Sequence, residues 1–144
     1  MRRVLVLALV VVLASAPVAL AASSGTVRGA VRIVPITVGL VVDPSSAATG
    51  VSVHAKATVV NASASVTAAV RVELRLDRVG VVMKAETGKT SFTLKPGKST
   101  AVSWNLCGRV AGTYVVLARA ETEGVFVDSP ARLLTIRAGP KTCK

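Results

Sequence analysis

Few residues of this 144-residue chain could act as nucleophiles, metal ligands or paired acid–base catalysts. The only histidine is His54, the only cysteines are Cys107 and Cys143, and no GxSxG, HExxH or phosphate-binding loop is present. Glu73 and Asp77 share one face of a predicted strand but lie about 13 Å apart, too far for paired acid–base catalysis. The sequence therefore predicts a protein that is not an enzyme and that uses no cofactor and no metal.

Basic residues outnumber acidic ones, 18 to 7, and give a formal net charge of +11. This charge predicts attraction to anionic cell-surface polymers. The candidate contacts are the strand arginines and turn lysines Arg71, Arg75, Lys95 and Lys98. Because Arg71 and Arg75 alternate with Glu73 and Asp77, charge pairing on a solvated sheet is favoured, and a docking face for an acidic polymer is the alternative. A specific nucleic-acid site is not expected, because few aromatic residues have exposed parity.

The N-terminal residues have the pattern of an export signal. Arg2 and Arg3 precede an apolar run from Val4 to Ala16, and Pro17 is followed by the small-x-small pattern Ala19-Leu20-Ala21. Residues 1–21 are therefore predicted to be a cleaved secretory signal peptide, which leaves the mature chain with a net charge of +9. The alternative is a retained membrane anchor, since the apolar stretch is long enough to span a bilayer. The predicted location is secreted, periplasmic or on the cell surface, with no stable membrane anchor after cleavage.

Period-two alternation dominates the rest of the chain. In the clearest run, apolar residues from Val66 to Leu76 alternate with mostly polar ones, and short turn segments separate similar runs. This pattern predicts an all-β, immunoglobulin-like Greek-key β-sandwich of seven to eight antiparallel strands over residues 36–138, after an N-terminal signal helix. Trp104 and Tyr114 have inward parity. Residues 22–35 form a leader or an extra edge strand, and residues 139–144 form a tail with Cys143.

Several segments occur in an order typical of one family: Val42-Asp43-Pro44-Ser45, Leu94-Lys95-Pro96-Gly97-Lys98-Ser99, Trp104 and Ala111-Gly112-Thr113-Tyr114. From about Ile36 to Ile136 the chain resembles a bacterial CARDB-type (cell-adhesion-related) immunoglobulin-like domain. The resemblance implies a surface or secreted setting and a role in adhesion or in spacing modules.

The two cysteines are expected to form a disulfide. An oxidising compartment favours this outcome. In an immunoglobulin-like sandwich, Cys107 precedes the Tyr114 strand and Cys143 follows the last strand, so both should lie at one end. Free or intermolecular thiols are the alternative. The sequon Asn61-Ala62-Ser63 is interpreted as a turn.

These observations favour a secreted, non-enzymatic binding or structural module, adhesion-related or in contact with anionic cell-surface polymers or another extracytoplasmic protein. The alternative is a pilin-like or complex-bound assembly subunit that exchanges a strand through residues 26–34.

Overall fold

Ten β-strands and no helix make up the part of the chain that the computed structural model describes, which is residues 35–87, 90–139 and 142–143. The first sheet, called sheet one, has the order β1 (Ile36–Asp43), β3 (Ser52–Asn61), β7 (Ser99–Gly108), β5 (Val81–Thr87). Sheet two has the order β2 (Ser46–Ala48), β10 (Arg132–Arg137), β8 (Gly112–Thr122), β4 (Ala68–Leu76), β6 (Ser91–Leu94), with β9 (Val125–Asp128) paired to β8. The predicted signal segment and nearly all of the leader lie outside the described residues.

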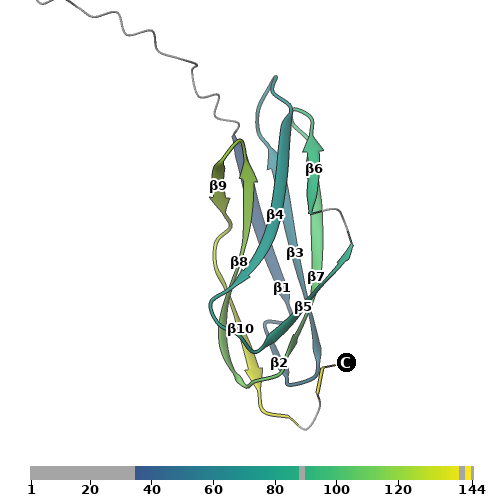
Figure 1. Ribbon diagram of the computed structural model, residues 1–144, viewed down its shortest axis with the longest axis vertical. Helices are drawn as coiled ribbons and strands as arrows, with labels where there is room; N and C mark the ends of the chain where they lie inside the picture. The colour runs from purple at the N-terminus through teal and green to yellow at the C-terminus, as the bar shows by residue number, and fades with distance from the viewer. Residues whose placement is uncertain (1–34, 88–89, 140–141, 144) are drawn as a thin grey trace, which may run out of the picture. The chain divides into compact units, whose positions relative to one another are not determined.

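The two sheets pack face to face as a sandwich (Figure 1). All strand pairs are antiparallel except β2 with β10, which are parallel. Sheet one corresponds in position to the A-B-E-D sheet of immunoglobulin-like domains, and β10, β8 and β4 correspond to the G-F-C strands of the facing sheet. From β4 to β8 the chain alternates between the sheets, because β4, β6 and β8 lie in sheet two whereas β5 and β7 lie in sheet one. The predicted all-β Greek-key sandwich is confirmed.

Strict alternation of the side chains makes the core. On β4, Val70, Val72 and Leu74 are buried, whereas the intervening residues are exposed. Trp104 on β7 of sheet one and Tyr114 on β8 of sheet two are also buried, as their parity predicts. Most of the buried side chains are Val, Leu, Ile and Ala, which favour a pleated, half-buried surface.

Two strands lie outside the prediction. The strand β2 has three residues and pairs parallel to β10, and β9 has four residues after the turn at Glu123 and Gly124. Segments this short carry little alternation, so their pairing depends on the neighbouring strand rather than on their own sequence. The count of seven to eight strands was therefore too low.

Candidate binding face

The outward side chains of β4, β8 and β9 form a charged surface, called here the outer face of sheet two. Strand pairing places Arg71 opposite Glu121, and Glu73 opposite Arg119. Arg75 lies next to Glu73, with Nε and Oε1 3.7 Å apart, and both side chains are about half exposed. Each of these arginines therefore lies beside a carboxylate. The face offers both hydrogen-bond donors and hydrogen-bond acceptors, but it has no continuous basic stripe.

Two shallow hollows mark this face. The larger, an open groove of about 530 Å³, is lined from β4, β6 and β8 by Ala69, Val70, Arg71, Ser91, Phe92, Thr93, Glu121 and Glu123. The smaller, about 100 Å³, is lined by Arg71, Glu73, Arg119, Glu121 and Phe126. Arg71 and Glu121 line both hollows and separate them. Ala69 is the smallest side chain of the larger hollow, which explains the depression between its longer neighbours.

The shorter of the two ion pairs described on this face is one that the sequence did not reveal. Arg119 donates from Nε and Nη2 to the two carboxylate oxygens of Asp128, at 2.7 Å each. This hydrogen bond lowers the pKa of Asp128 below the ordinary aspartate value and raises the pKa of Arg119. Arg119 also lies over the exposed ring of Phe126, 5.4 Å from its centroid. Asp128 and Phe126 were missed because β9 was not predicted.

The four predicted polymer contacts do not form one site. Arg71 and Arg75 are exposed on the outer face of sheet two, on either side of Glu73. Lys95 and Lys98 are exposed in the turn between β6 and β7, and Leu94 pairs with Ala68 on β4. Lys95 thus lies about four residue steps, roughly 13 Å, from Arg71 along the strand direction. The structure separates the arginines from the lysines into two groups.

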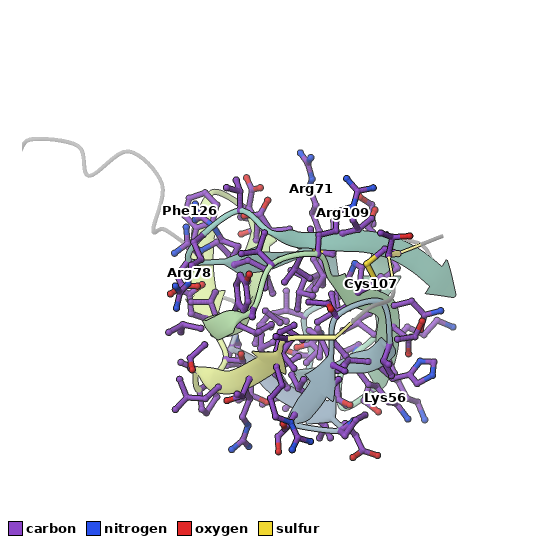
Figure 2. All side chains as sticks on the ribbon, turned by 90° about the horizontal axis from the view of Figure 1, so that it is seen from below. Lys56, Arg71, Arg78, Cys107, Arg109 and Phe126 are labelled. Atoms are coloured by element: carbon purple, nitrogen blue, oxygen red, sulfur yellow. A yellow bond between two sulfur atoms is a disulfide. The ribbon has the colours of Figure 1, made fainter. Side chains whose placement is uncertain are left out.

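The expected disulfide between Cys107 and Cys143 is confirmed, with Cα atoms 5.8 Å apart. Cys107 has outward parity on β7, so the bond lies on the outer side of sheet one, at the end of the sandwich where the chain also finishes (Figures 1 and 2). The tail after β10 crosses this end, where the Thr49 hydroxyl donates to the Gly139 carbonyl at 2.7 Å. The bond therefore ties the tail of sheet two to sheet one. We call this end the disulfide end.

Asn61, the first residue of the sequon, is fully buried at the opposite end. Its Nδ2 donates to the carbonyls of Val66, at 2.7 Å, and Leu94, at 3.1 Å, and its Oδ1 accepts from Ser63 N–H at 3.0 Å. All of these bonds are within the protein. Asn61 is therefore a structural residue that ties the loop after β3 to the end of β6, and the interpretation of this segment as a turn is confirmed.

Within the described ranges, no three His, Cys, Asp or Glu side chains gather as a metal site would require. His54 lies on an exposed position of β3. No helix among the described residues is long and apolar enough to cross a membrane.

No protein-family model matches the chain, and no curated protein matches it. Among solved structures, it is similar to the cupredoxin domain of amoB from Nitrosocaldus yellowstonii, with a TM-score of 0.58 and 11% identity over 76% of this chain and 90% of that chain. It is also similar to Spo0M, a sporulation control protein from Bacillus subtilis, with a TM-score of 0.54 and 14% identity over 75% of this chain and 51% of that chain.

The residues of this chain do not fit a copper site of the cupredoxin kind. Such a site uses two histidines and a cysteine thiolate. The chain has one histidine, and both cysteines are joined in the disulfide. At these levels of identity the likenesses show the fold alone, which is an all-β sandwich.

Proposed function

We propose that this protein is an exported, non-enzymatic immunoglobulin-like module that associates with anionic cell-surface polymers through its overall positive charge. The observation that carries the proposal is the distribution of that charge. The chain has a net charge of +11, yet Arg71, Arg75 and Arg119 each lie beside a carboxylate. A surface of this kind raises the local concentration of polyanions without focusing them on one point.

The extracytoplasmic location is supported by the disulfide and by the export signal read in residues 1–21. Disulfides persist in oxidising compartments and are rare where thiols are kept reduced. The non-enzymatic role is supported by the placement of the acidic groups. Asp128 on the outer face is engaged by Arg119, and Asp77 in the loop after β4 accepts a hydrogen bond from Val115 N–H at 2.9 Å. The finer assignment to a CARDB-type, adhesion-related module rests on the sequence resemblance.

The test compares two groups of basic residues at fixed ionic strength. Binding of the exported protein to immobilised teichoic acid, lipopolysaccharide and heparin is measured for R71A, R75A, K95A and K98A. A diffuse contact predicts similar, modest losses for all four, because each variant removes one exposed charge. Collapse of binding on R71A alone, with K95A and K98A unchanged, would show a built site on the outer face.

An assembly subunit is a second candidate, favoured by one observation. The strand β6 pairs with β4 over Ala68–Arg71, whereas β4 continues to Leu76. Val72 N–H already donates to the Thr90 carbonyl at 2.7 Å, so the edge of β4 beyond Val72 is the place where an added strand could extend sheet two. Size-exclusion chromatography of the exported protein with and without residues 22–34 tests this candidate. A monomer in both cases would remove the assembly role, and loss of an oligomer on deletion would support it.

A further inference from the structure

Two loops of the disulfide end each carry an exposed valine directly after an arginine. Residues 77–80 join β4 to β5, and residues 109–111 join β7 to β8, so both loops cross from one sheet to the other. Val79 is 94% exposed and Val110 is 57% exposed, and Ala111 is exposed beside them. Figure 2 looks onto this end and labels Arg78 and Arg109, which are both exposed. We call these two loops the valine tip.

The valine tip is built rather than loose. The Gly80 carbonyl accepts hydrogen bonds from Arg109 N–H at 2.7 Å and Val110 N–H at 3.3 Å. The Val110 carbonyl in turn accepts from the Tyr114 hydroxyl at 2.7 Å. Gly80 has φ of 122°, and a Cβ there would meet the Tyr114 hydroxyl oxygen at 2.6 Å and Val110 Cβ at 3.1 Å. The two loops are therefore locked together, and Val79 and Val110 flank the same glycine.

The charges around the tip are mainly positive. Arg78 lies over the Tyr114 ring, 5.0 Å from its centroid, and Arg109 follows the end of β7. The one acidic residue of the two loops is Asp77, whose carboxylate accepts from Val115 N–H. Single exposed valines are common on protein surfaces. Here two of them share a rigid tip with two arginines, on a chain whose net charge is strongly positive.

The geometry points to the valine tip as a site that docks on the surface of an anionic phospholipid membrane. Val79 and Val110 would enter the interface, where apolar side chains leave water, while Arg78 and Arg109 would meet lipid phosphates. A soluble polyanion has no apolar phase, so it would gain nothing from the valines. The inference goes beyond the proposed function and does not depend on it, because the valines carry no charge.

The test is co-sedimentation of the exported protein with vesicles of phosphatidylglycerol and phosphatidylcholine. We expect V79S/V110S to weaken vesicle binding by roughly tenfold, and R109Q to weaken it by roughly fivefold. The control double variant V41S/L133S removes two other exposed apolar side chains, 61% and 62% exposed, and should leave vesicle binding unchanged. Binding of V79S/V110S to heparin should equal that of the parent.

Three results would overturn the proposal: full vesicle binding by V79S/V110S, an equal loss in V41S/L133S, or an equal loss of heparin binding in V79S/V110S. A second measurement reports directly whether the tip enters the lipid. The native Trp104 is buried, so the introduced indole of V79W is the ring that acrylamide can quench freely. Phosphatidylglycerol vesicles should protect that indole, and unchanged quenching would contradict insertion of the tip.

Discussion

At the scale of single residues, Asn61 shows how one buried amide can join a loop to the end of a strand. Its three hydrogen bonds satisfy two carbonyls and one N–H that would otherwise be buried without partners. We expect N61A to lower the free energy of unfolding by about 3 kcal/mol, because it leaves these groups unpaired. Urea denaturation measures the change. The neighbouring exposed substitution S65A serves as the control, and a loss below about 0.5 kcal/mol for N61A would refute this role.

Tyr114 and Gly80 form a second residue-scale unit. Y114F removes the hydroxyl that bonds the Val110 carbonyl and should cost about 1–2 kcal/mol. G80A should be more damaging in the parent than in Y114F, because the atom that its Cβ would meet is the Tyr114 hydroxyl oxygen. A double-mutant cycle by thermal or urea unfolding measures this coupling. Strictly additive losses of stability would mean that the Cβ introduced at residue 80 does not meet the Tyr114 hydroxyl.

At the scale of elements, the disulfide joins the tail that follows β10 to β7 and closes a loop of 36 residues. In the loop-entropy model such a bond stabilises the fold by about 3–4 kcal/mol. The C107A/C143A variant should lose about this amount in urea denaturation. The intact mass of the exported protein should be about 2 Da below its reduced mass, since one disulfide removes two hydrogens. Two alkylatable thiols in the native, non-reduced protein would contradict the bond.

The pairing of β8 with β9 predicts a pH dependence at Asp128. Its hydrogen bond with Arg119 lowers the pKa of the carboxyl group. The ion pair therefore stabilises the fold fully at a pH above the ordinary aspartate pKa, and this stabilisation is lost as the pH falls through the lowered pKa. A carboxyl ¹³C titration should place the Asp128 midpoint below the ordinary range. R119Q should raise the Asp128 midpoint toward the ordinary aspartate range, whereas R75Q should raise it much less. An unchanged midpoint in R119Q would show that the ion pair does not form in solution.

Alternation in the sequence was enough to predict the long strands, because one face of each is buried. Val70, Val72 and Leu74 on β4 are the clearest case. The same parity predicted the buried Trp104 and Tyr114. It could not reveal β9, whose four residues pair through the turn at Glu123 and Gly124. The Arg119–Asp128 contact and the smaller hollow, which Phe126 lines, depend on that pairing, so they were also absent from the prediction.

Turn residues show a second limit of the sequence. Asn61 has the pattern of a modification site, but its burial depends on β6 and the 61–66 loop meeting at one end of the sandwich. The close approach of the sheets at Gly108 is another tertiary effect. A Cβ at this position would meet Ile136 Cγ2 at 2.5 Å, so only glycine fits there. Such contacts come from packing between distant strands, which local periodicity does not report.

At the scale of the whole molecule, the two proposed contacts use the positive charge in different ways. Association with polymers depends on charge that is spread over the surface and interrupted by carboxylates on the outer face of sheet two. The valine tip adds apolar contact at the disulfide end, away from that face's hollows. The first contact should therefore be sensitive to ionic strength throughout, and the second should retain a part that salt does not screen.

The most direct measurement of the central claim is the salt dependence of polymer binding. The exported protein is titrated with teichoic acid and heparin from low ionic strength to well above the physiological range, where the screening length falls below about 8 Å. A diffuse electrostatic contact predicts that affinity falls steeply and continuously, and that R71A and K95A follow the parent with a similar small offset. Tight binding that survives high salt and is abolished by R71A alone would contradict the account.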